Sequence, residues 1–238
     1  LLERSAGASD CPTFGLRMAE TRQLSDFGAV SLLITHQSTM RDALTTLVQY
    51  RQLLNPSLLV AVEEHGELVV VREELLVTGL GPMRQSYELA IGVIYRLFRS
   101  VLGPRWRAHS VNFAHAAPGD LSVHRRIFGP ICEFESDFHG LTCTSADLSA
   151  PNPSADPRLA QHAERYVRTL PNAAGGALPG EVQKALHLLL PIGQASIDNV
   201  AASLGLTTRT LQRRLIADGS DFAGLLERTR RALAARYV

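Results

Sequence analysis

The chain has 238 residues, of which 45% are hydrophobic and 20% charged, and its formal net charge is +1. This is the composition of an ordinary globular protein with apolar side chains for one large core or two smaller ones. Three cysteines without metal-type spacing argue against a disulfide framework and a zinc site. No apolar run is long enough to cross a membrane and no secretory signal is visible, so we expect a reducing, cytoplasmic setting.

The first 150 residues mix helical and strand patterns. Apolar residues at helical spacing, such as Met40, Leu44 and Leu47, predict a helix, and alternating or continuous apolar runs predict strands. In chain order we expect a helix over 39–53, a β-hairpin of 57–62 and 68–71 that turns near Gly66, a buried helix over 84–103 with Gly103 at its C-cap, a strand over 109–115, a short helix over 119–129, and a second hairpin of short strands over 131–135 and 140–145. This order indicates an α+β fold, with helices packed on a mixed, antiparallel-rich sheet.

The rest of the chain has helical patterns. One helix is predicted over about 157–170, and the stretch after it, rich in proline, glycine and alanine, is the best linker candidate. Four more helices are expected over 181–190, 196–204, 208–218 and 221–238. We therefore divide the chain into an N-terminal domain over 1–170, a linker over 171–180 and a helical domain over 181–238. The chain starts at Leu1 instead of Met and stops inside a helical pattern, so we expect both ends to be cut.

Charge is distributed unevenly along the chain. Residues 179–238 hold eight basic and five acidic side chains, a net charge of +3, whereas residues 1–178 hold sixteen and eighteen, a net charge of −2. All but one of the eight bases are arginine, which suits bidentate contacts with phosphate and guanine. The asymmetry fits a nucleic-acid-binding region, although a solvated helical surface would produce it as readily.

A helix-turn-helix spacing is centred on Gly205. Apolar residues at i, i+3, i+4 and i+7 predict a first helix with Ser196 as its N-cap, and Gly205 suits the tight turn that ends it. Thr207 can cap the second helix, in which Leu211 and Leu215 point to one side. Three long polar side chains gather on the opposite side, with a fourth on the flank: Arg209, Gln212, Arg213 and Arg214.

The second of these helices suits the major groove of DNA, where arginine can bond guanine and glutamine can bond adenine. Base contacts would then come from the side of the helix that faces away from Leu211 and Leu215, and phosphates would be bound by the flank of the helix and by its N-terminal amides. The predicted DNA contacts are Thr207, Thr208, Arg209, Gln212, Arg213 and Arg214. The alternative is a surface helix of a purely structural subdomain.

The segment "SIDNVAASLGLTTRTLQRRLIADGSDFAGLLERTRRALAARYV" resembles the first half of the DNA-binding domain of AraC/XylS-type transcription regulators. The specific pieces are "VAASLGLTTRTLQRRL", a following glycine and aromatic residue (Phe222), and a long helix rich in arginine and alanine. The family's base-facing positions fall on Arg209, Gln212 and Arg213. Members carry a second helix-turn-helix after the long helix, so the resemblance implies that this chain is truncated after the first.

The N-terminal domain resembles the arabinose-binding-type domain of the same family. The matching pieces, in order, are "CPTFGLRMAE", "LSDFGAVSLLITHQSTMRDAL", "VNFAHAAPGD" and "FGPICEFESDFHGLTCTSADLSAP". The resemblance implies binding of a small-molecule effector and dimerisation through this domain. Candidates for the effector site are aromatic and histidine residues between the sheet and its helices: Tyr50, Tyr87, Phe113, His115 and Phe134. Each of them is also a typical core residue.

Two other interpretations are open. A small-molecule-binding or metal-dependent enzyme domain would use the histidine-rich region that contains His109, His115, His124, Cys132 and His139. The spacings match no metal motif, and no phosphate loop or nucleophile motif is present. The C-terminal helices could instead bind a protein partner, for which Ile216 is the one apolar anchor near the exposed face.

The residues and the resemblance together favour a bacterial, cytoplasmic, one-component transcription regulator and not an enzyme. The expected partners are double-stranded operator DNA, a small-molecule effector of unknown identity and a second copy of the chain, with RNA polymerase left open. No membrane, metal or cofactor is expected.

Overall fold

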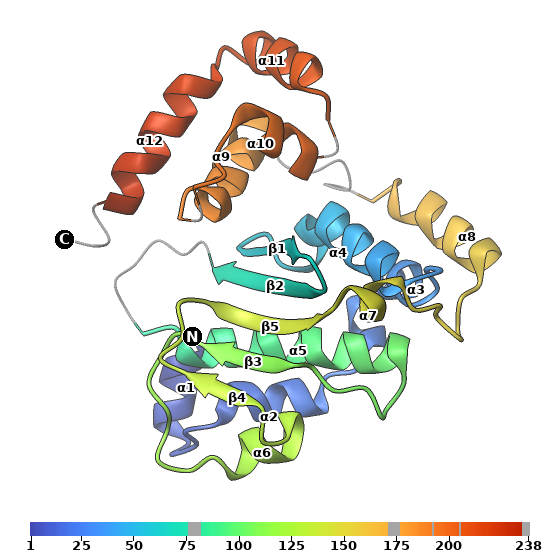
Figure 1. The fold of residues 1–238 in the computed structure, drawn as a ribbon, viewed down its shortest axis with the longest axis vertical. Helices are drawn as coiled ribbons and strands as arrows, with labels where there is room; N and C mark the ends of the chain where they lie inside the picture. Colours follow the sequence, from blue (N-terminus) through green and yellow to red (C-terminus); the bar gives the residue numbers. More distant parts are fainter. Residues whose placement is uncertain (76–81, 171–176, 192, 205, 235–238) are drawn as a thin grey trace. The chain divides into compact units, whose positions relative to one another are not determined.

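The computed structural model in Figure 1 describes residues 1–75, 82–170, 177–191, 193–204 and 206–234, without the side chains at 24, 25 and 202. The chain divides into two compact units. The first unit comprises Leu1–Val48 and Val60–Leu170, and the second comprises Gln49–Leu59 and Pro171–Val238. Among the described residues, no helix has the length and apolar character that a membrane span requires.

A five-stranded mixed sheet forms the centre of the first unit. Its strands are β1 (Leu58–His65), β2 (Leu68–Leu75), β3 (Ser110–Phe113), β4 (Cys132–Phe134) and β5 (His139–Thr144), in the order β1-β2-β5-β3-β4. β5 runs antiparallel to both β2 and β3, whereas β3 and β4 are parallel. The predicted hairpin of β1 and β2 is confirmed, and Gly66 occupies its turn with a φ of +67°, which favours glycine. The α+β class is therefore confirmed.

The predicted pairing of the last two strands is wrong, because β3 lies between β4 and β5. The chain leaves β3, passes through α6 (Ser122–Phe128) and returns as β4 beside β3 in the same direction, as a crossover connection requires. The Asn112 side chain holds this edge by donating to the Glu133 carboxylate at 3.0 Å. Two strands that are close in the sequence, such as β4 and β5, usually form a hairpin. The local sequence does not show that β3 pairs with both of them and separates them.

Helices cover the sheet of the first unit. α5 (Arg84–Leu102) packs against β2 and β5, and α1 (Leu2–Ala8) and α2 (Phe14–Thr21) pack on its far side (Figure 1). The contact between α2 and α5 is very close, because a Cβ added at Gly92 would lie 2.6 Å from the Cβ of Ala19. The pattern predicted α5 and its buried character, but none of the helices before residue 39.

Five more helical segments complete this part of the chain. They are the 3₁₀ turn η1 (Leu24–Phe27), α3 (Ala29–Thr35), α4 (Met40–Leu54), α7 (Ser145–Ser149) and α8 (Pro157–Val167). α3 packs against α8, which begins at an Asp156 N-cap with proline in its first turn. The helical geometry of α4 is interrupted at Tyr50, where φ is −103° and ψ is 15°. α4 therefore changes direction close to the division between the two units.

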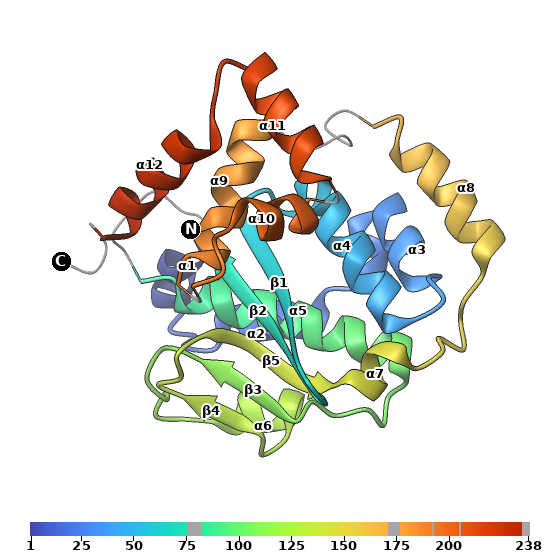
Figure 2. The same cartoon turned by 45° about the horizontal axis from the view of Figure 1, so that its top comes forward.

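The second unit is helical, as predicted, with α9 (Leu178–Leu189), α10 (Ile197–Ser203), α11 (Thr208–Ala217) and α12 (Phe222–Ala234), drawn in orange to red in Figure 2. α9 packs against the other three helices, and it begins at Leu178, three residues before its predicted start. The core of this unit consists of small and aliphatic side chains from all four helices: Val182, Ala185, Leu186, Val200, Ala201, Leu211, Leu215 and Leu225. The predicted turn residue Gly205 and the last four residues of the predicted fourth helix lie outside the described residues.

Candidate nucleic-acid interface and effector site

The N-terminus of α11 is fixed by threonines. Thr207 adopts an extended backbone conformation and its side chain accepts a hydrogen bond from the backbone N–H of Thr210 at 3.2 Å, which confirms it as the N-cap. The Thr208 hydroxyl donates to the Asp198 carboxylate of α10 at 2.6 Å. This bond joins the first turn of α11 to α10. The two helices are therefore held together by a polar contact as well as by the apolar side chains that they share in the core.

The two sides of α11 differ completely in exposure. Leu211 and Leu215, 0% and 1% exposed, face the helical core. The opposite side presents an exposed row at i, i+3, i+4 and i+7: Arg209, Gln212, Arg213 and Ile216. Within the described part of the chain, Arg209, Arg213 and Arg214 form no ion pair, so their guanidinium groups face solvent. Ile216, which is 73% exposed, extends this polar row with an apolar end.

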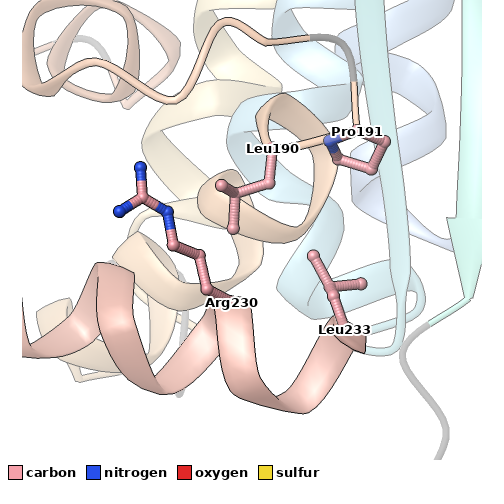
Figure 3. Close-up of a pocket in the computed structure, with 4 residues that line it drawn as sticks. All are labelled: Leu190, Pro191, Arg230 and Leu233. Carbon is pink, nitrogen blue, oxygen red and sulfur yellow. The ribbon is translucent and has the colours of Figure 1, made fainter. Parts of the chain in front are cut away.

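A second surface feature of this unit lies away from that row. An open groove is lined by Leu190 and Pro191 after α9 and by Arg230 and Leu233 of α12 (Figure 3). Its floor is apolar, and Arg230 supplies its only charge among the described lining residues. It contains none of the residues predicted to contact DNA.

Four of the five predicted effector residues lie together in the first unit. The Phe113 and Phe134 rings stack with centroids 5.3 Å apart, and the His115 ring lies 5.2 Å from Phe113 and 5.8 Å from Phe134. His139, which the sequence did not point to as an effector residue, joins this group to Tyr87, whose ring it stacks on at 3.6 Å. The structure therefore places an aromatic and histidine cluster between β3, β4, β5 and α5.

The fifth candidate, Tyr50, lies elsewhere. It is 3% exposed and belongs to the segment Gln49–Leu59, which groups with the second unit. Its neighbours Arg51 and Gln52 donate to the Glu181 carboxylate of α9, and Arg51 and Glu181 form an ion pair with side chains 12% and 10% exposed. Tyr50 thus sits beside a buried polar contact of the helical unit and not in the aromatic cluster.

Sequence reasoning missed Glu88, the fully buried acid beside the aromatic cluster. Its Oε1 accepts from Arg84 Nε at 2.8 Å and lies 3.2 Å from His124 Nε2 of α6 and 3.7 Å from His115 Nε2. The available signal was an acidic residue in a helix that is apolar nearly all round, since such a residue must find buried partners. Glu73 of β2 is a second missed acid, 1% exposed, and burial raises its pKa to about 8.

The enzyme interpretation finds no support in this region. His109 is exposed, and among the described residues no group of three or more histidine, cysteine, aspartate or glutamate side chains is arranged to hold a metal ion. Burial, with a smaller contribution from Glu88, raises the pKa of the Cys132 thiol to about 12, which removes it as a nucleophile at neutral pH. Burial lowers the pKa of His139 to about 4, so that ring is neutral.

The fold and these surfaces define two units, a mixed α+β unit with a buried polar cluster and a helical unit in which α11 exposes a row of long polar side chains. Residues 1–152 match the family model described as the arabinose-binding domain of AraC transcription regulator, N-terminal. The chain belongs to this AraC family of transcription regulators. The resemblance read from the sequence is thereby confirmed, and so is the assignment to regulators instead of enzymes.

Individual relatives agree with this assignment. The chain is 33% identical over 240 residues to the HTH-type transcriptional regulator VirS of Mycobacterium tuberculosis, covering 100% of this chain and 71% of VirS. It is 23% identical over 230 residues to the ornithine utilization regulator of Pseudomonas aeruginosa, covering 95% of this chain and 67% of that protein. The crystal structure of the transcriptional regulator CdpR from Pseudomonas aeruginosa shares the fold, with a TM-score of 0.54 and 22% identity over 94% of this chain and 73% of CdpR.

Proposed function

We propose that this chain is an effector-responsive regulator that binds specific DNA sequences by placing α11 in a major groove. The observation that carries the proposal is the division of α11 into a leucine side anchored in the core and an exposed side whose arginines form no ion pair with the described residues. A purely structural surface helix needs the first side, whereas the second side, with Arg209, Gln212 and Arg213 exposed together, suits contacts with base edges.

Each residue of the row has a distinct role in this proposal. Arg209, Gln212 and Arg213 read base edges, because arginine and glutamine make bidentate bonds to guanine and adenine. Ile216 at the end of the row contacts a thymine methyl group. Arg214 on the flank holds a phosphate, and Thr207 and Thr208 position the first-turn amides of α11 against the backbone.

The proposal is tested by measuring DNA binding directly. The purified chain is used to select duplexes from a random library, and the selected duplex is titrated by fluorescence anisotropy at two salt concentrations. We expect Arg213→Ala to weaken binding at least tenfold and the matched control Arg158→Ala, an exposed arginine of the first unit, to leave it unchanged. Equal losses for both variants, or no enrichment over random duplex, would overturn the proposal.

For the first unit, we propose small-molecule effector binding and homodimerisation in the bacterial cytoplasm. The family model's description supports effector binding, because it names an arabinose-binding domain. The buried polar cluster at Glu88 supports a binding site, since ordinary cores of this size do not retain unsatisfied acids and histidines. Dimerisation is tested by light scattering of the purified chain, for which a monomer mass at all concentrations would contradict it.

A further inference from the structure

One row of side chains crosses four strands of the sheet and includes His139, on which Tyr87 of α5 stacks. Glu73 of β2 is in register with His139 of β5, and Phe113 of β3 is in register with Phe134 of β4. Extending the β3–β5 register by one residue from Asn112 and Gly140 brings Phe113 opposite His139. Residues paired directly across strands point to the same face, so the row joins an acid, an imidazole and two aromatic rings.

Helix residues complete a buried site over this row. Tyr87 of α5 stacks on His139, Glu88 of α5 bonds His124 of α6, and the His124 ring packs edge-on against Phe113 and Phe134. Glu73, Glu88 and His124 are each at least 99% buried. The His115 side chain, 18% exposed, stands at the margin and opens the cluster to solvent.

Several polar atoms of this site have no hydrogen-bond partner among the described residues. They are both carboxyl oxygens of Glu73, Oε2 of Glu88, Nε2 of His115 and Nδ1 of His124. Buried polar groups in proteins are almost always satisfied, and three of these side chains are linked through Glu88, which lies 3.2 Å from His124 Nε2 and 3.7 Å from His115 Nε2. The free atoms of Glu88, His115 and His124 lie together beside the aromatic rings, and this arrangement supports a bound ligand that satisfies them.

The hydrogen bonds that are made define the chemistry of the free atoms. His115 Nδ1 lies 3.0 Å from the Ala116 carbonyl, so it carries the proton and leaves Nε2 as an acceptor. His124 Nε2 donates to Glu88, and the tautomer of His124 that makes this bond has its lone pair on Nδ1, which is then an acceptor. Burial lowers the pKa of His115, in agreement with a neutral ring. The second oxygen of Glu88 is also an acceptor, so the free atoms of Glu88, His115 and His124 all require donors.

We propose that this cluster is the effector site and that it takes a compound with a cationic N–H group, a primary ammonium or an amidinium or guanidinium, carried on an aromatic or apolar body. Three acceptors satisfy the N–H donors, and the rings of Tyr87 and Phe134 attract the cation and cover the body of the ligand. An anionic ligand would meet only lone pairs at these atoms. Among the described residues of the cluster, the permanent cation is Arg84, which is already bonded to Glu88 and the Pro12 carbonyl.

The inference rests on the proposed effector-responsive function, and its test is kept independent of DNA. The purified chain is titrated by calorimetry with benzylammonium and benzamidine as cationic probes, and with benzyl alcohol and benzoate as neutral and anionic probes of similar shape. We expect the two cations to bind at least tenfold more tightly than benzoate. Tighter binding of benzoate, equal binding of all four probes, or no binding of either cation would overturn the inference.

Variants locate the binding within the cluster. His115→Phe keeps a ring at the margin and removes the acceptor, so we expect at least a tenfold loss of benzylammonium affinity. The matched control His109→Phe replaces an exposed histidine and should leave affinity unchanged. Glu88→Gln should abolish binding, and His115→Phe keeps the test valid if Glu88→Gln does not fold. Unchanged affinity in His115→Phe would place the cations elsewhere and overturn the site, while DNA binding measured separately would still decide the proposed function.

Discussion

Glu73 makes the stability of the first unit depend on pH in a way that a single substitution removes. Burial raises the pKa of its carboxyl from 4.5 to about 8, so the folded protein holds this proton more tightly than the unfolded chain does. The contribution of this proton to the free energy of unfolding is therefore fully present below pH 4.5 and is lost as the pH rises towards 8. At about 1.4 kcal/mol per pH unit, wild type should lose about 2.7 kcal/mol relative to Glu73→Gln between about pH 5.5 and about pH 7.5.

Urea unfolding followed by tryptophan fluorescence measures this difference. The chain has one tryptophan, Trp106, whose ring stacks on Phe98 in the first unit, so its signal reports on the unit that contains Glu73. Glu67→Gln, at an exposed position beside the β1–β2 turn, is the control and should keep the wild-type pH profile. Parallel profiles for wild type and Glu73→Gln, within about 0.5 kcal/mol at every pH, would refute the reasoning.

Three further predictions concern packing and are checked by urea unfolding. Leu211→Ala should destabilise the second unit by about 2–5 kcal/mol because it leaves a cavity at a fully buried position. Ile216→Ala, on the exposed side of the same helix, should change the stability by less than about 0.5 kcal/mol. Equal effects of the two substitutions would contradict the orientation of α11. Gly92→Ala should cost about 1–3 kcal/mol because its Cβ meets α2, and Gly7→Ala, where a Cβ meets nothing within 4 Å, should be neutral or stabilising by up to about 1 kcal/mol. Glu181→Ala should lower the free energy of unfolding by about 3 kcal/mol, because the Glu181 carboxylate accepts hydrogen bonds from two residues of α4. A urea midpoint equal to that of the wild type would show that this contact does not stabilise the protein.

The parts of the molecule that depend on local sequence could be predicted. The orientation of α11 follows from the spacing of Leu211 and Leu215 alone, because a helix presents every third or fourth residue to one side. The cap at Thr207 and the turn at Gly66 likewise follow from the intrinsic preferences of single residues. These features need no knowledge of distant contacts.

The features that sequence reasoning missed are set by contacts between distant residues. The insertion of β3 between β4 and β5 depends on pairing and not on order along the chain. The sequence marks Glu88 as an acid in a mostly apolar helix, but its partner His124 comes from α6, 36 residues later. Residue type alone groups Tyr50 with the effector candidates, but the kink in α4 falls at this residue and its segment joins the helical unit.

The most direct measurement of the central claim is the base preference of wild type and three α11 variants on a randomised duplex library, read by sequencing the bound fraction. We predict that Arg209→Ala and Gln212→Ala each relax preference at one or two base pairs and leave the others unchanged, because they remove single base contacts. Arg214→Ala should weaken binding to all sequences about equally, because it removes a phosphate contact. A uniform loss in all three variants, with the wild-type preference intact, would contradict the claim that α11 reads DNA.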